Sequence, residues 1–98
     1  MNQEQLKLIK EICKQNGIAY LGLFGSFARG DYDRKSDVDL LIDYSPGSPI
    51  KNLFDLPGLE AQFQDVFGRK IDLVTRKYLN PRIKDYVYKD LKVLYEGQ

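Results

Sequence analysis

The sequence contains no histidine, no tryptophan and a single cysteine, Cys13. Without histidine, the chain itself cannot supply a histidine general base, a Ser-His-Asp triad or a histidine-ligated zinc site. A lone cysteine forms no internal disulfide. Cys13 lies on the apolar side of a predicted helix, which favours a small buried side chain over a reactive thiol. These absences exclude several common catalytic and metal-binding classes.

The sequence also has no excess of charge of one sign and no long apolar run. Fifteen basic and fourteen acidic side chains give a net charge of +1. Proteins that hold a duplex by its phosphates usually carry a marked basic excess, so we expect no direct nucleic-acid binding. No apolar run approaches the ~20 residues that span a bilayer, and the N-terminal residues lack the apolar core of a signal peptide. We therefore expect a cytoplasmic protein without a membrane partner, with residues 1–98 forming one domain.

Apolar periodicity and turn residues predict helices that alternate with strands, which is typical of a layered α/β or α+β domain. In the helix expected within residues 52–67, Pro57 requires either a start near Leu56 or a kink, and the sequence leaves both open. We expect Leu53 on the apolar face of this helix and Ile83 on the inner face of the last one. The other expected helices cover 3–15 and 81–89, and the expected strands cover 18–24, 38–44, 70–74 and 91–95.

The most informative stretch is Gly25-Ser26-Phe27-Ala28-Arg29-Gly30 followed by Ser36-Asp37-Val38-Asp39-Leu40. Because residues two apart in a strand share a face, Asp37 and Asp39 lie on the same side. Repulsion between two such carboxylates raises one pKa, and a divalent cation relieves it. Mg²⁺ prefers one or two carboxylates plus phosphate oxygens, and the Gly25-Ser26 turn offers backbone N–H groups and a hydroxyl for phosphates. The stretch therefore predicts a metal–nucleotide site.

Three common motifs fail to explain these residues. Gly25 and Gly30 have the spacing of a P-loop, but Asp31 and Tyr32 stand where that motif needs Lys and Ser or Thr. Phe27 occupies the second glycine position of the Rossmann pattern. An EF-hand that began at Asp31 would lack both its central glycine and its final glutamate.

The combined pattern resembles the nucleotidyltransferase fold of the DNA polymerase beta superfamily. The signature of that superfamily is a Gly-Ser turn, then Asp-x-Asp on a strand, then a later acidic residue. Gly25-Ser26, Asp37-Val38-Asp39 and Asp72 supply these parts in order. The local sequence looks like the minimal nucleotidyltransferase (MNT) group, which is encoded beside HEPN-domain toxins. The resemblance covers nearly the whole chain and implies an α+β fold with a small mixed β-sheet flanked by helices.

The resemblance also implies residue roles. Gly25 and Ser26 would bind the nucleotide triphosphate. Asp37 and Asp39 would bracket two Mg²⁺ ions, and Asp72 would complete the site beside the acceptor hydroxyl. Arg29 is expected to bind the nucleotide through a phosphate, although it could equally brace the turn.

The function implied is Mg²⁺-dependent transfer of AMP from ATP to a hydroxyl, expected to be a tyrosine, of a partner HEPN-type ribonuclease toxin. The chain would then be the antitoxin, in a hetero-oligomer with the toxin. Two alternatives stay open: a non-catalytic module that occludes its partner, and transfer to a small molecule. The intact Gly25, Ser26 and three aspartates favour the enzyme, because a binding module has no need of clustered carboxylates.

Overall fold

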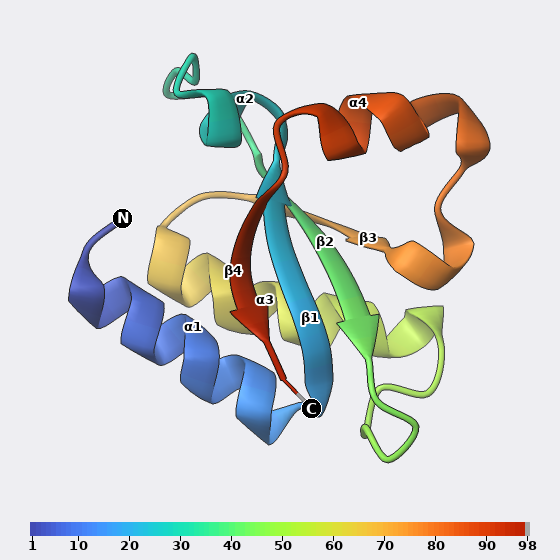
Figure 1. The fold of residues 1–98 in the computed structure, drawn as a ribbon. Coiled ribbons are helices and arrows are strands. Elements are labelled where there is room, and N and C mark those ends of the chain that lie inside the picture. The colour runs from blue at the N-terminus through green and yellow to red at the C-terminus, as the bar shows by residue number, and fades with distance from the viewer. Residues whose placement is uncertain (98) are drawn as a thin grey trace.

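The computed structural model describes residues 1–97, which form a four-stranded sheet flanked by helices (Figure 1). The strands are ordered β3-β2-β1-β4; β1 runs antiparallel to β2 and β4, whereas β2 and β3 are parallel. The sheet is therefore mixed, as expected. The strands are β1 (Ile18–Phe24), β2 (Val38–Tyr44), β3 (Ile71–Thr75) and β4 (Lys92–Glu96), and the helices are α1 (Gln3–Gln15), α2 (Gly25–Arg29), α3 (Leu56–Phe67) and α4 (Lys84–Lys89).

Helix α1 begins with a reciprocal pair of hydrogen bonds. The Asn2 side chain accepts from the Gln5 backbone N–H at 2.8 Å, and the Gln5 side chain accepts from the Asn2 backbone N–H at 3.1 Å. Such a capping box satisfies N–H groups that have no partner within the helix. Ile9 and Cys13 on its inner face are fully buried, and burial raises the pKa of the Cys13 thiol to about 12. The prediction that Cys13 is a buried side chain is confirmed.

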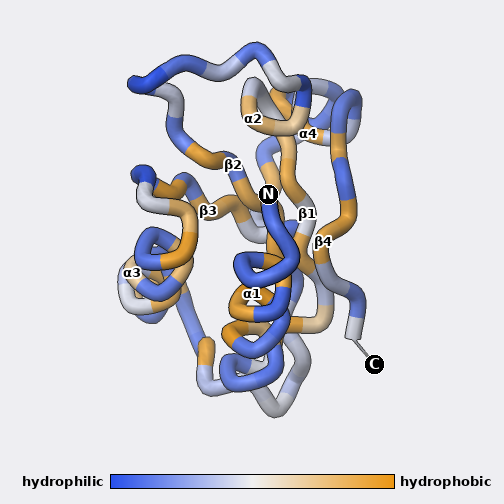
Figure 2. Tube along the Cα trace, turned by 90° about the vertical axis from the view of Figure 1, so that its left-hand side faces the viewer, coloured by the Kyte–Doolittle hydropathy of each residue, from blue (hydrophilic) through white to orange (hydrophobic). Residues whose placement is uncertain are grey.

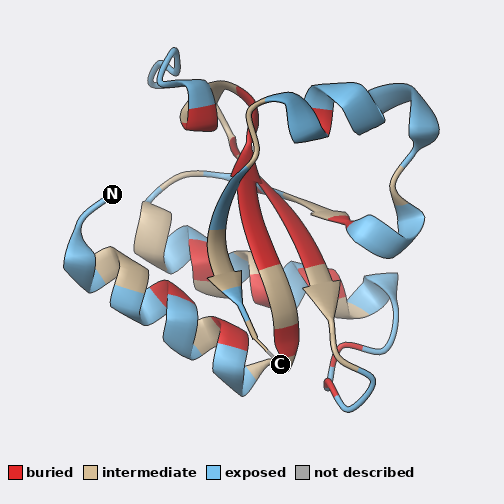
Figure 3. Cartoon of the chain, in the orientation of Figure 1, coloured by how far each residue is buried: buried red, intermediate tan, exposed pale blue. Residues whose placement is uncertain are grey.

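The two central strands are buried on both faces of the sheet (Figure 3). Helices α1 and α3 lie side by side against one face, where they cover Leu40 and Ile42 of β2 (Figure 2). On the other face Leu41 packs with Phe24 and with Val87 of α4. Because alternate residues of a strand share a face, the carboxylate of residue 39 lies on the same side as Leu41, toward α4. Within residues 1–97, no helix is long and apolar enough to cross a membrane.

Two sequence expectations about apolar faces are wrong. Leu53 is 55% exposed and Ile83 is 40% exposed. Both lie in 3₁₀ turns (Leu53–Asp55 and Pro81–Ile83) that precede α3 and α4, and the three-residue repeat of such turns directs side chains differently from an α-helix. The sequence left open whether this helix starts near Leu56 or is kinked at Pro57, and in the structure α3 starts at Leu56. Pro57 stands in the first turn, where its missing N–H breaks no helical hydrogen bond and no kink is needed.

Candidate active site

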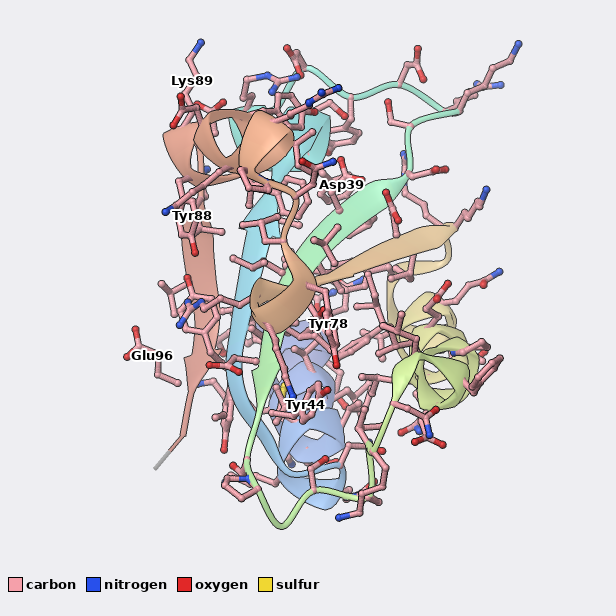
Figure 4. The ribbon with its side chains drawn as sticks, turned by 90° about the vertical axis from the view of Figure 1, so that its right-hand side faces the viewer. Asp39, Tyr44, Tyr78, Tyr88, Lys89 and Glu96 are labelled. Atoms are coloured by element: carbon pink, nitrogen blue, oxygen red, sulfur yellow. The ribbon has the colours of Figure 1, made fainter. Side chains whose placement is uncertain are left out.

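Asp39 lies near the start of β2, between the two neighbouring strands. Its Cα partner on β1 is Phe24, and its partner on the parallel strand β3 is Asp72. Adjacent strands are about 4.8 Å apart, so the strand pairing brings these two carboxylates to neighbouring positions. Figure 4 shows Asp39 below α4, at the opposite end of β2 from Tyr44.

Gly25 follows β1 directly, with a φ of +75°, which side chains other than glycine rarely tolerate. A Cβ at this position would collide with Asp39 Oδ2 and would stand 3.2 Å from the Tyr86 hydroxyl oxygen. Gly25 therefore allows the backbone to turn and leaves space for the carboxylate. The structure shows the Asp39 carboxylate against Gly25, and the expected binding of phosphate at the Gly25-Ser26 turn stays a prediction.

The environment of Asp39 disfavours its charged form. Burial, and then the charges of Asp72 and Asp37, raise the pKa of the Asp39 carboxyl to about 6, while Arg29 lowers it. The predicted repulsion among the aspartates is therefore present, although burial is the larger cause. A bound cation would lower this pKa again, since an opposite charge favours the ionised form.

The other two aspartates differ in exposure. Asp37 is half-buried just before β2, and Asp72 is exposed on β3. Among residues 1–97, no three Asp, Glu, His or Cys side chains come close enough together to hold a metal ion. The set of donors, all carboxylates, is nevertheless the kind that Mg²⁺ prefers, and the metal assignment of Asp37, Asp39 and Asp72 stays a prediction.

Ser26 and Arg29 belong to the short helix α2. The Ser26 carbonyl accepts from the N–H groups of Gly30 and Asp31, at 2.9 and 3.2 Å, and so closes the turn. Arg29 Nε lies 3.1 Å from Asp31 Oδ2, and its Nη1 lies 3.5 Å from Asp90 Oδ2, just beyond the end of α4. These contacts are those of a brace between α2 and α4, and the contribution of Ser26 and Arg29 to nucleotide binding stays a prediction.

Sequence reasoning missed two residues that α4 brings to the site, Tyr86 and Asp90. The Tyr86 ring meets Phe24 edge-on at 6.2 Å and lies 5.9 Å from the Arg29 guanidinium. Asp90 Oδ2 is buried and accepts no hydrogen bond, so Arg29 is the charge that offsets it. Tyr86 lies within α4 and Asp90 directly follows its last residue, and no local sequence signal shows what either side chain contacts.

The fold and the site together define a nucleotidyltransferase. The family model described as "Nucleotidyltransferase domain" matches residues 6–94, and the chain belongs to this family. The chain is 32% identical over 82 residues to protein adenylyltransferase MntA of Thermococcus cleftensis, a match that covers 84% of this chain and 80% of that protein. The enzyme class expected from the sequence is thereby confirmed.

Solved structures share the fold at lower sequence identity. A chain in the crystal structure of a toxin–antitoxin complex with AMP-PNP gives a TM-score of 0.77 at 20% identity, covering 95% of this chain and 74% of the other. A chain in the complex of tri-AMPylated Shewanella oneidensis HEPN toxin with MNT antitoxin gives a TM-score of 0.72 at 18% identity, covering 100% and 75%. This chain and the two solved chains therefore share the same mixed-sheet fold.

Proposed function

We propose that this chain transfers AMP from ATP to a tyrosine hydroxyl of a HEPN-type toxin and thereby acts as its antitoxin. The observation that carries the proposal is the Asp39 carboxylate, which lies against Gly25 and next to Asp72 in the strand pairing. Three comparisons support the acceptor and the donor. One relative is named a protein adenylyltransferase, and proteins of the same fold occur in complexes with AMP-PNP and with an AMPylated HEPN toxin.

Each element of the site has a role in this transfer. The backbone N–H groups at Gly25 and Ser26 hold the triphosphate, and the three aspartates hold Mg²⁺. When bound, Mg²⁺ supplies positive charge for the departing pyrophosphate and lowers the pKa of the acceptor hydroxyl. The acceptor hydroxyl gives up its proton to solvent, and its oxygen forms a bond to the α-phosphorus while the bond from phosphorus to pyrophosphate breaks. Asp72, exposed on the edge strand β3 beside Asp39, acts on the incoming acceptor hydroxyl.

The environment of Asp39 favours an enzyme over an occluding module. The carboxylate is partly buried beside two like charges, and a neutral residue of similar shape would relieve this repulsion. A protein that only covered its partner would gain stability from such a change and would lose nothing. Binding of a cation that accompanies the substrate explains why this position carries a charged carboxylate.

Asp72→Asn separates nucleotide binding from transfer. Because Asp72 is proposed to act mainly on the attacking hydroxyl, we expect this variant to bind MgATP within about threefold of wild type, yet to transfer AMP about a hundredfold more slowly. Calorimetric titration measures the binding, and labelled ATP with the partner protein measures the transfer. Asp65→Asn, on the exposed side of α3, is the matched control and should change neither.

Two results would contradict this role of Asp72. Transfer at the wild-type rate would remove Asp72 from the site. A parallel loss of MgATP binding and transfer would instead place Asp72 among the groups that hold the triphosphate.

A further inference from the structure

Arg69 joins two segments that are far apart in the sequence. It lies half-buried in the connection between α3 and β3, two residues after the end of α3. Its Nη1 donates hydrogen bonds to the backbone carbonyls of Asp33 at 2.6 Å and Ser36 at 3.2 Å. Both acceptors belong to the loop that leads from α2 into β2. The guanidinium therefore ties this loop to the α3–β3 connection.

Two aromatic rings lie beside the guanidinium. The Phe27 and Tyr32 rings stack with centroids 4.1 Å apart and planes 22° apart. The Arg69 guanidinium carbon lies 5.2 Å from the Phe27 centroid and 5.0 Å from that of Tyr32. A planar guanidinium can pack against aromatic rings and donate hydrogen bonds at the same time, which the ammonium of lysine does less well.

The loop that Arg69 holds is itself a closed turn. Asp33 Oδ1 accepts from the Lys35 backbone N–H at 2.8 Å and from the Ser36 hydroxyl at 3.3 Å. The Asp33 backbone N–H donates to Ser36 Oγ at 3.0 Å. With this local structure already formed, attachment at the Asp33 and Ser36 carbonyls orients the loop as a unit.

Hydrogen bonds hold the backbone on both sides of Asp37. The peptide group before Asp37 is held through the Ser36 carbonyl by Arg69 Nη1. The peptide group after Asp37 is held through the Val38 N–H, which donates to the Lys70 carbonyl at 2.9 Å. The peptide groups on both sides of Asp37 are thus held by the consecutive residues 69 and 70, which orients the Cα–Cβ bond of Asp37.

We propose that Arg69 is a positioning residue for AMP transfer, which holds the loop before β2 so that Asp37 points into the site. Arg69 acts through the backbone around Asp37 and does not itself contact the substrate. This inference rests on the proposed function of Asp37, and part of its test is therefore independent of activity.

Limited trypsin digestion tests the attachment directly, without ATP, metal or partner. Arg34 and Lys35 lie exposed in the loop and are trypsin sites. In Arg69→Met we expect cleavage after these residues to be about tenfold faster than in wild type, because the loop opens locally more often. Lys70→Met is the matched control: it removes a neighbouring exposed positive charge, leaves the Lys70 carbonyl in place, and should be cleaved at the wild-type rate. Arg69→Lys should fall between the two.

Steady-state transfer then tests the positioning role. Arg69→Met should lower kcat about tenfold to a hundredfold, as expected for a displaced catalytic group. Its KM for ATP should stay within about threefold of wild type, because the hydrogen bonds of Arg69 go to Asp33 and Ser36 and not to Gly25 or Ser26. Arg69→Lys should recover part of the lost kcat, and Lys70→Met should match wild type. Circular-dichroism melts confirm that each variant is folded, and Arg69→Lys replaces Arg69→Met if the latter is not.

Each outcome decides one part of the inference. Equal cleavage of Arg69→Met and Lys70→Met would overturn the attachment. Faster cleavage with an unchanged kcat would overturn the positioning role. A wild-type chain that transferred no AMP would overturn the proposed function and with it the positioning role, while the cleavage ratio would still decide the attachment.

Discussion

Asp39→Asn is expected to abolish AMP transfer and, at the same time, to make the protein more stable at neutral pH. Transfer should fall by about a thousandfold or more, because the variant loses the carboxylate that lies between Gly25 and Asp72. Stability should rise because the variant removes a partly buried charge that two other aspartates repel. Few substitutions at a merely structural position would produce this opposite pair of effects.

The pH dependence of stability follows from the same carboxyl group. Its pKa is raised from an ordinary 3.8 to about 6 in the folded chain. Between these values the folded state binds more protons than the unfolded state, so stability falls as the pH rises through this window, and the loss stays constant above it. In the presence of EDTA, the gain in melting temperature of Asp39→Asn over wild type should therefore be larger at pH 8 than at pH 4.

Asp43→Asn is the control for both measurements. Asp43 lies on the same face of β2, near the other end of the strand, where Asp43 Oδ2 is 3.8 Å from Arg76 Nη1. This variant should transfer AMP at the wild-type rate. Transfer by Asp39→Asn near the wild-type rate would show that the reaction does not use Asp39.

Gly25→Ala should lower both the stability and the activity of the protein. A φ of +75° strains any residue with a Cβ by about 1–2 kcal/mol, which for a chain of this size lowers the melting temperature by roughly 5–10 °C. The new methyl group also collides with Asp39 Oδ2 and approaches the Tyr86 hydroxyl. We expect the displaced carboxylate to slow transfer about a hundredfold and to weaken MgATP binding. Ser26→Ala should weaken binding less, since the backbone donors remain.

Gly30→Ala is the control that measures the effect of backbone strain without a collision with Asp39. Gly30 also has a positive φ, of +87°, but a Cβ there would meet no atom within 4 Å. Backbone strain should lower the stability of Gly30→Ala about as much as that of Gly25→Ala. Gly30→Ala should nevertheless transfer AMP at close to the wild-type rate. Calorimetric titration with MgATP and labelled-ATP assays on both variants make the comparison. Equal activity losses in the two would mean that strain alone, and not displacement of Asp39, explains the effect.

The strands that carry the site could be predicted because their limits are marked locally. An apolar run that ends at Gly25 marks β1, and the alternation after Asp37 marks β2 up to the turn residues Ser45-Pro46-Gly47. The structure has both strands at the expected residues. The family signature also indicated the mixed sheet, which periodicity alone does not specify. Turn geometry was harder to predict, as Leu53 and Ile83 show, because short 3₁₀ segments have no strong sequence pattern.

The contacts around the site could not be predicted, since they depend on packing between distant segments. Arg69 binds the carbonyl of Asp33, 36 residues away. Tyr86 reaches Gly25 only because α4 folds back over the end of β1, where Val87 packs on Phe24 and Leu41. The contact between Asp39 and Gly25 could not be predicted either, because it depends on which strand pairs with β1.

Mass spectrometry of the partner protein tests the proposed transfer most directly. The purified chain is mixed with its HEPN-type partner, ATP and Mg²⁺, and the partner is digested and searched for AMP on tyrosine. We expect AMP on the partner with wild type and with Asp43→Asn, no AMP with Asp39→Asn or with EDTA, and loss of the partner's ribonuclease activity only where AMP is found. A wild-type chain that inhibits the partner while leaving it unmodified would contradict the transfer and would favour an occluding antitoxin.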